Sequence, residues 1–295
     1  MSNALIGPMR PNFLVLTPAC VLLGISTAYW SGASLDLLYI ILILAGALMA
    51  HTSVNALNEY FDFKSGLDTK TQRTPFSGGS GTLPAHPEME GAFLLLAWTT
   101  LTITSAIGAY FVWLQGWQLL PIGIFGLILL VTYTIWWVYQ PILCLIAPGL
   151  GFGILMVMGT HFALTGTYSW TSFVASLVPT FLVSNLLLLN QFPDAEADQS
   201  IGRKHFPITI GRQASSVLYG ILLLLAYVSV VVGVILGLLP SFSLLALLTA
   251  IPAWKACRGA YQNAENISAL IPSMGINVVI NLTTPILLAV GLFIG

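Results

Sequence analysis

The stretch LLYIILILAGALMAHTSVNALNEYFDFKSGLD, residues 37–68, joins a long apolar run to a short polar motif. The apolar part is long enough to cross a bilayer as a helix, which needs about 20 predominantly apolar residues. The polar part places Asn55, Asn58 and Asp62 three and four residues apart, so a helix would present them on one face, and His51 extends that face by a turn. The stretch therefore predicts a membrane helix whose polar end faces a cavity.

The rest of the chain has the same apolar character. Of its 295 residues, 57% are hydrophobic and only 6% are charged, and the mean hydropathy is +0.91, whereas soluble domains carry about 25% charged residues. This composition excludes a soluble globular enzyme. A net charge of −1 without a basic tail argues against a nucleic-acid partner. The three cysteines lack metal-ligand spacing and are expected to be small buried hydrophobes.

Apolar runs separated by Gly, Pro and polar clusters predict nine membrane helices. Their approximate ranges are 13–30, 37–60, 91–114, 117–139, 142–165, 170–192, 213–238, 240–257 and 271–294. No removable signal peptide is expected, so the first run is read as a membrane helix. The expected fold is an all-α integral membrane protein with a single transmembrane domain over residues 1–295.

The basic residues test this map, because cytoplasmic segments of membrane proteins are enriched in Lys and Arg. All nine Lys and Arg residues fall on one side of the map, together with every acidic residue except Asp36. This distribution predicts a multi-pass protein of the cell (inner) membrane with a cytoplasmic N-terminus. Most charges follow the second and sixth helices, in loops at about 61–90 and 193–212, where we expect the active site.

A second polar motif repeats the first at the end of the sixth predicted helix. Asn190, Asp194 and Asp198 lie four residues apart, again on one helix face. Asn190 and Asp194 have the same Asn-x-x-x-Asp spacing as Asn58 and Asp62. The recurrence indicates two four-helix pseudo-repeats followed by a ninth helix.

The two motifs together predict a magnesium–diphosphate site. Carboxylates aligned at a helix end repel one another and are costly beside hydrocarbon, so they need a cation. Asp and Asn oxygens suit Mg²⁺, which is often shared with substrate phosphates. The two facing sets of Asp and Asn oxygens are the candidate ligands. Nearby basic residues suited to phosphate contacts are Lys64, Lys70, Arg73, Arg203, Lys204 and Arg212.

These motifs resemble the intramembrane aromatic prenyltransferases of the UbiA superfamily. The resemblance covers nearly the whole chain and rests on Asn58-x-x-x-Asp62 with Asp68, and on Asp194-x-x-x-Asp198 followed by Gly202-Arg203-Lys204. The chain looks most like the branch that prenylates 1,4-dihydroxy-2-naphthoate in menaquinone biosynthesis. That likeness comes from Arg10-Pro11, the pattern from Asn55 to Asp68, and Met158-Gly159-Thr160. The chain departs from the branch at Glu59, where Asp is usual, and at Cys144 and Phe152, where a basic residue and a Glu are usual.

The resemblance implies Mg²⁺-dependent transfer of a polyprenyl group from an isoprenyl diphosphate to an aromatic acceptor, with loss of CO₂ from a naphthoate. The metal ligands that it implies are Asp62, Asp68, Asp194 and Asp198, with Asn58 and Asn190 helping. The catalytic residues that it implies are Asp62, Asp68, Asp194, Asp198 and Tyr139. The substrate-binding residues that it implies are Asn55, Asn58, Lys70, Arg73, Asn190, Arg203 and Lys204.

Two alternatives remain open. One is the same chemistry on 4-hydroxybenzoate, homogentisate or another lipid acceptor. The other is a cation-coupled membrane transporter, which would also use intramembrane Asp and Asn side chains. Transporter carboxylates are expected near the bilayer midplane, whereas the predicted motifs lie at one membrane face. Their position therefore favours the prenyltransferase.

Overall fold

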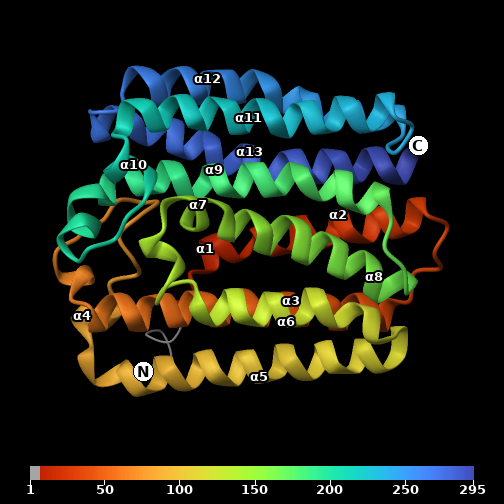
Figure 1. Ribbon diagram of the computed structural model, residues 1–295, viewed down its shortest axis with the longest axis horizontal. Helices are drawn as coiled ribbons and strands as arrows, with labels where there is room; N and C mark the ends of the chain where they lie inside the picture. The colour runs from red at the N-terminus through yellow and green to blue at the C-terminus, as the bar shows by residue number, and fades with distance from the viewer. Residues whose placement is uncertain (1–6) are drawn as a thin grey trace.

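The computed structural model describes residues 7–295, which form long helices stacked side by side along one axis (Figure 1). The α-helices are α1 (Pro11–Leu14), α2 (Leu16–Trp30), α3 (Leu37–Lys64), α4 (Thr82–Ala85), α5 (Glu90–Gln115), α6 (Leu120–Thr132), α7 (Pro141–Leu150), α8 (Gly159–Thr165), α9 (Trp170–Ser200), α10 (Phe206–Thr209), α11 (Arg212–Ile235), α12 (Ala250–Gln262) and α13 (Ile267–Ile294). A π-helix, η7 (Gly151–Met158), joins α7 to α8, and a 3₁₀ helix, η8 (Ser241–Thr249), leads into α12. Shorter 3₁₀ turns are η2 (Gly7–Met9), η3 (Leu67–Thr69), η4 (Pro87–Met89), η5 (Trp117–Leu119) and η6 (Trp137–Tyr139). No strand occurs in the described part of the chain, which confirms the all-α prediction.

Seven segments within residues 7–295 are long and apolar enough to cross a membrane. They coincide with seven of the nine predicted helices and are Pro11–Trp30, Leu37–Lys64, Pro87–Gln115, Pro141–Thr165, Trp170–Ser200, Arg212–Ile235 and Ile267–Ile294. The fourth predicted helix is a shorter apolar helix, Trp117–Thr132, because the chain leaves the helix at Tyr133 and turns through η6. The eighth corresponds to η8 and α12, where a 3₁₀ helix changes into an α-helix. These segments are those of a multi-pass membrane protein, and the count of nine is not confirmed.

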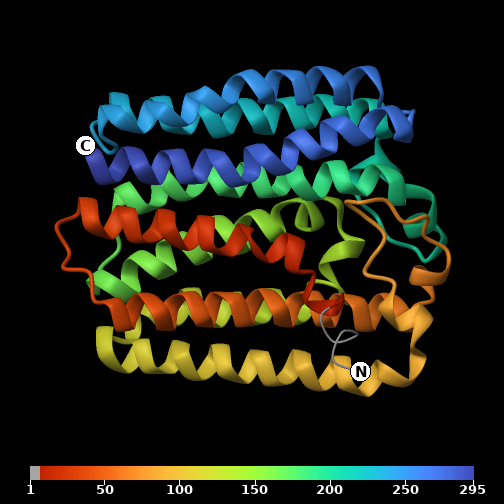
Figure 2. The same cartoon turned by 180° about the vertical axis from the view of Figure 1, so that it is seen from behind.

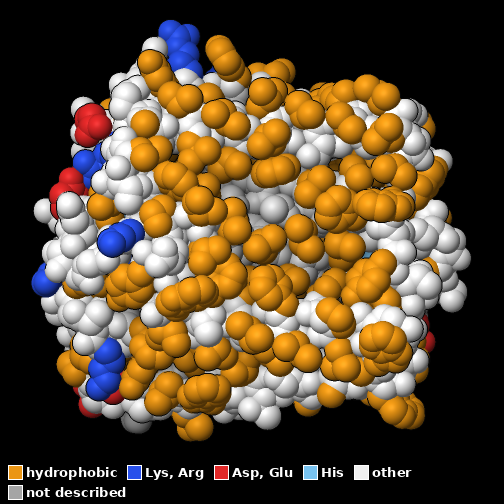
Figure 3. Space-filling view, viewed as in Figure 1, with side chains coloured by type: hydrophobic (Ala, Val, Ile, Leu, Met, Phe, Trp, Pro, Cys, Tyr) orange, Lys and Arg blue, Asp and Glu red, His pale blue; other side chains and the backbone are white. Residues whose placement is uncertain are grey.

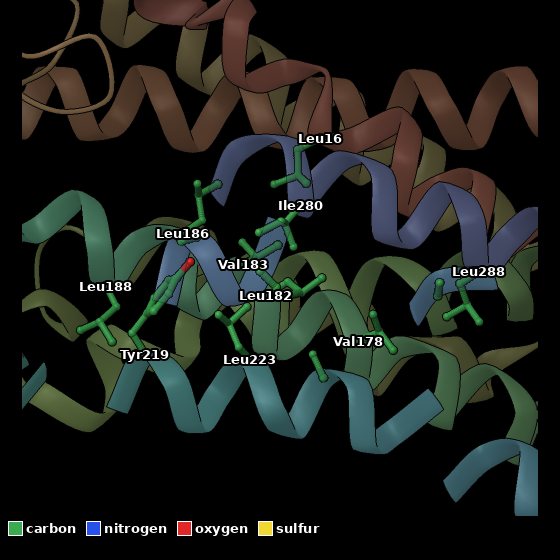
Figure 4. Packing of buried hydrophobic residues seen from close by; sticks show 14 of the residues in the cluster. Leu16, Val178, Leu182, Val183, Leu186, Leu188, Tyr219, Leu223, Ile280 and Leu288 are labelled. Atoms are coloured by element: carbon green, nitrogen blue, oxygen red, sulfur yellow. The ribbon is translucent and has the colours of Figure 1, made fainter. Parts of the chain in front are cut away.

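The long helices pack in pairs. Helix α3 packs against α5, α9 packs against α11, and α13 contacts α2 as well as η8 and α12. Figure 2 shows α2 and α13 in the middle of the stack. Apolar side chains such as Leu182, Tyr219 and Ile280 interlock between α9, α11 and α13 (Figure 4). Because lipid is as apolar as these side chains, van der Waals contact and close helix approach stabilise the packing.

The charged side chains gather at one end of the bundle. Figure 3 shows them along the edge where Figure 1 places α4 and α10, while the rest of that face is mostly apolar. The loops after α3 and α9 meet at this end, where Lys70 Nζ lies 3.3 Å from Ser200 Oγ. Asp36 begins α3 at the opposite end and accepts a hydrogen bond from Leu38 N at 2.7 Å. The loops predicted to hold the active site therefore lie together.

Candidate active site

A cavity of about 710 Å³ lies inside the bundle, between walls from α3, α5, α6, α7, η7, α8 and α9. Along α3 its lining extends from Asp62 to Ile43. At a rise of 1.5 Å per residue this distance is roughly 28 Å, nearly the thickness of the hydrocarbon core of a bilayer, which is about 30 Å. The cavity is therefore long enough to hold an extended apolar chain.

Both polar motifs open into the charged end of this cavity. The predicted residues that line it are Asn55, Asn58, Asp62, Asp68, Asn190, Asp194, Asp198 and Arg203. The helical spacing of each motif explains this convergence, because α3 and α9 each present one face to the same space. Six other predicted residues stand outside the lining that residues 7–295 define, and these are Lys64, Lys70, Arg73, Tyr139, Lys204 and Arg212.

Arg203 joins the two motifs. Its guanidinium contacts the carboxylate of Asp62 and lies 2.9 Å from Asp198 Oδ1. The second carboxylate oxygen of Asp198 lies 3.0 Å from His205 Nε2. Burial alone would lower the pKa of Arg203, but Asp62 and Asp198 outweigh it and raise that pKa above its ordinary value. The charged end of the cavity is thus a buried network that spans α3, α9 and the loop after α9.

A second charged cluster holds the glycine-rich turn at 77–81 against α3. Glu59 is fully buried and accepts hydrogen bonds from Arg10 Nε at 3.0 Å and from Ser80 Oγ at 3.0 Å. Gly79 has a φ of +71°, and an added Cβ there would stand 3.0 Å from Asp68 Oδ1. Because Gly79 has no side chain, the backbone of the turn can lie close to Asp68. Glu59 is the buried ion-pair partner of Arg10.

Several buried oxygens at this end have no hydrogen-bond partner among the described residues. Three of them line the cavity walls and belong to Asp68 (Oδ2), Asn190 (Oδ1) and Asp194 (Oδ1). A buried acceptor without a partner costs about 1–3 kcal/mol. Burial and the neighbouring carboxylates of Asp62 and Glu59 also raise the pKa of Asp68 to about 7. A hard cation would satisfy these oxygens, so the donor set fits Mg²⁺.

The carboxylates at this end do not form a ready-made metal site. No group of three His, Cys, Asp or Glu side chains within residues 7–295 is placed to hold a metal ion as it stands. The guanidinium of Arg203 contacts both Asp62 and Asp198, so a positive charge already stands between these two carboxylates. The chemistry of the donor set fits a cation, whereas its arrangement is that of an arginine-bridged pair.

The sequence did not single out several residues that line the cavity. Tyr133 lines the cavity, whereas the predicted Tyr139 does not. The reason is that α6 ends at Thr132 and the chain turns before η6. The helix predicted over residues 117–139 runs through this turn and therefore does not reveal it. Gln191 donates a hydrogen bond to Cys144 Sγ at 3.1 Å, also in the wall. No sequence pattern distinguishes His205.

Comparisons with known proteins agree on one family. Residues 17–279 match the UbiA prenyltransferase family. The 1,4-dihydroxy-2-naphthoate octaprenyltransferase of Bacillus subtilis (strain 168) is 28% identical over 288 residues, which cover 97% of this chain and 90% of that protein.

Solved structures share the fold. The apo structure of a UbiA homolog from Aeropyrum pernix K1 has a TM-score of 0.73 and 18% identity, covering 97% of this chain and 98% of that one. A UbiA homolog from Archaeoglobus fulgidus bound to DMAPP and Mg²⁺ has a TM-score of 0.60 and 14% identity, covering 97% of this chain and 99% of that one.

Proposed function

The chain belongs to the UbiA prenyltransferase family, and from that premise we propose that it prenylates 1,4-dihydroxy-2-naphthoate in menaquinone biosynthesis. The donor is a polyprenyl diphosphate, and the acceptor is the one named for the Bacillus subtilis relative. The observation that carries the proposal is the cavity, which has carboxylates and amides at one end and apolar walls along its length. With a cation held between the carboxylates and the diphosphate, such a cavity complements a ligand with a diphosphate head and an apolar tail.

We assign Mg²⁺ to the charged end of the cavity. The proposed ligands are Asn58, Asp62, Asp68, Asn190, Asp194 and Asp198. When bound, Mg²⁺ would supply positive charge that stabilises the leaving diphosphate. Arg203 lines the same end and suits bidentate contact with phosphate oxygens. Asn55 also faces this space, while Lys70, Arg73 and Lys204 belong to the surrounding loops and are proposed to attract the anionic donor.

The reaction exchanges one bond of the prenyl group for another. The bond between the prenyl carbon and the diphosphate oxygen breaks, and its electron pair leaves with the diphosphate. A bond forms from the prenyl carbon to the ring carbon that carries the carboxylate, and the carboxylate leaves that carbon as CO₂, returning its bonding electron pair to the ring. An aromatic face beside the prenyl carbon would stabilise its developing positive charge. The resemblance proposes Tyr139 for this role. Tyr133 lines the cavity in the same region and is the candidate that the geometry supports.

We also propose nine membrane crossings in two four-helix repeats followed by α13. In this arrangement α6 is the fourth crossing and the segment from η8 through α12 is the eighth. The pair α3 and α5 then corresponds to the pair α9 and α11, which the packing supports. The charged end is proposed to face the cytoplasm at the inner membrane, following the enrichment of Lys and Arg in cytoplasmic segments.

The acceptor is tested by incubating the purified protein with labelled polyprenyl diphosphates and separate aromatic acceptors, and by identifying products by mass spectrometry. We expect 1,4-dihydroxy-2-naphthoate to give a prenylated, decarboxylated product, with EDTA abolishing turnover and Mg²⁺ restoring it. If a product forms only with 4-hydroxybenzoate or homogentisate, the proposed acceptor is wrong and the reaction class is retained. No diphosphate release from any pair by folded protein would refute the proposed function.

The metal assignment predicts the effect of two substitutions. Asp62→Asn and Asp194→Asn should each lower kcat/KM by about 100-fold or more, because electrostatic groups at a reacting centre contribute on that scale. Asp36→Asn is the matched control, because Asp36 caps α3 at the opposite end of the bundle and Asn also caps helices. Wild-type activity in both site variants would contradict the metal assignment.

A further inference from the structure

Six glycines line the apolar part of the cavity. An added Cβ would stand 3.2 Å from Ile107 at Gly46 and 3.6 Å from Ile122 at Gly159, so these two lie against a neighbouring helix. The other four come from three parts of the fold. They are Gly108 of α5, Gly123 and Gly126 of α6, and Gly151 at the start of η7. A glycine within a helix is about 1 kcal/mol less favourable than Ala. Its presence at four helical positions around one cavity therefore needs a physical reason.

Close helix packing explains other glycines of the same bundle but not these four. An added Cβ at Gly149 or Gly153 would collide with Thr180 of α9. At Gly108, Gly123 and Gly151 an added Cβ would meet no described atom within 4 Å. At Gly126 it would meet Leu155 Cδ1 alone, at 3.8 Å. The four glycines therefore leave room in the cavity rather than bring helices together.

The four glycines lie at different depths from the charged end. Gly151 stands roughly 15 Å along the helix from Pro141, and Gly108 roughly 27 Å from Glu90, at 1.5 Å per residue. Backbone pairing of Lys204 N with Val138 O, at 3.3 Å, places the beginning of α7 at the charged end. Because α6 runs back toward that end, Gly126 is nearer to it than Gly123.

The head end of the cavity identifies the kind of ligand that fills it. Asp68 lines the cavity, is only 6% exposed, and has an Oδ2 atom without a hydrogen-bond partner among the described residues. An anionic head held there through a cation would send its tail along the apolar walls. An extended geranyl chain spans roughly 10 Å, given carbon–carbon bonds of about 1.5 Å, and would end before the deeper glycines.

We infer that these glycines set the longest prenyl chain that the enzyme accepts. Gly126 and Gly151 keep the middle of the path open, and Gly108 and Gly123 keep its far part open. This inference rests on the proposed function. A large side chain at middle depth blocks long donors while short donors still react, and one at the far part blocks only the longest.

The test compares purified Gly126→Leu, Gly151→Leu and Gly123→Leu with wild type, using geranyl, geranylgeranyl and octaprenyl diphosphates with the acceptor that the wild type uses. We expect the two middle-depth variants to retain geranyl transfer and to lose at least about tenfold in kcat/KM for octaprenyl transfer, a typical effect of misfit in an apolar pocket. Gly123→Leu should keep geranyl and geranylgeranyl transfer and lose octaprenyl transfer.

The matched control is Gly91→Leu. Gly91 lies in the first turn of α5, its added Cβ would meet nothing described within 4 Å, and it is outside the cavity lining. We expect it to use all three donors like wild type. Should a leucine variant fail to insert, Gly126→Val and Gly151→Val apply the same test.

Two results would overturn the inference while leaving the proposed function intact. One is an octaprenyl-to-geranyl ratio of kcat/KM that equals the wild-type ratio in all variants. The other is an equal loss of all donors in variants whose circular dichroism and thermal unfolding match wild type. A folded wild type that is inactive with every donor refutes the proposed function, and the inference with it.

Discussion

Arg203 is the residue through which the two carboxylate motifs meet. It contacts Asp62 of α3 and Asp198 of α9, and His205 lies beside the other oxygen of Asp198. The side chains of Asp62 and Arg203 are only 9% and 11% exposed. Charges so deeply buried are tolerated only when they are paired, because removal from water costs several kcal/mol per ion. Arg203 therefore keeps two like charges close together at the head of the cavity.

Removing this guanidinium should destabilise the protein in a way that Mg²⁺ partly reverses. Arg203→Met is expected to lower the free energy of unfolding by about 3–5 kcal/mol, since breaking a buried ion pair leaves a charge without a partner. Thermal unfolding followed by circular dichroism should show a larger difference from wild type in EDTA than in Mg²⁺. Lys255→Met, on the exposed surface of α12, should match wild type in both conditions. An unchanged unfolding temperature of Arg203→Met in EDTA would show that these contacts do not stabilise the fold.

At the scale of elements, the glycine-rich turn depends on one close approach to Asp68. Gly79→Ala and Gly32→Ala each place Ala at a positive φ, of +71° and +82°, which costs roughly 1–2 kcal/mol. Only at Gly79 does the new Cβ also contact Asp68, because nothing described lies within 4 Å of the position at Gly32. Both variants should lose similar stability, whereas only Gly79→Ala should need more Mg²⁺ for half-maximal activity. Equal Mg²⁺ requirements would argue against a metal-binding role for Asp68.

Regular helices made part of this arrangement predictable. Spacing along α3 and α9 correctly placed Asn55, Asn58 and Asp62 on one wall and Asn190, Asp194 and Asp198 on another, because helix geometry fixes which residues share a face.

The other contacts are tertiary and lie outside regular helices. Arg203 returns to Asp62 from a loop, and Tyr133 enters the wall where α6 stops short of its predicted end. Neither the Arg203–Asp62 contact nor the early end of α6 follows from a periodic pattern in the sequence. The bond between Arg10 and Glu59 likewise joins residues far apart in the chain.

At the scale of the whole molecule, charge and cavity are arranged along the same axis. Charged side chains crowd the end where α3 and α9 finish (Figure 3). The cavity runs from that end toward the other, and its lining on α3 extends from Asp62 to Ile43. An apolar tail buried in this cavity gains about 0.8 kcal/mol per CH₂ relative to water. Under the proposed function, the diphosphate head of the donor binds at the charged end. The cavity is therefore charged at one end and apolar along its length, and the proposed donor would fit it in one direction only.

The proposed orientation and the nine crossings predict a labelling pattern. In a Cys257→Ser background, Gln118→Cys and Ser241→Cys should react with a membrane-impermeant maleimide in intact cells. Gln140→Cys and Gln262→Cys should react only after permeabilisation. All four positions are exposed. Gln118 and Gln140 form one pair, which brackets α6, and Ser241 and Gln262 form the other, which brackets the segment from η8 through α12. These are the two proposed crossings that are not among the seven long apolar segments.

Each departure from this pattern has its own meaning. Labelling of both members of a pair from the same side would remove that crossing, since a single helix across the bilayer must separate its ends. The fully inverted pattern would keep both crossings and place the charged end outside, against the enrichment of Lys and Arg in cytoplasmic segments. Because the native Cys20 and Cys144 are buried, the background variant should remain unlabelled and give the reference signal.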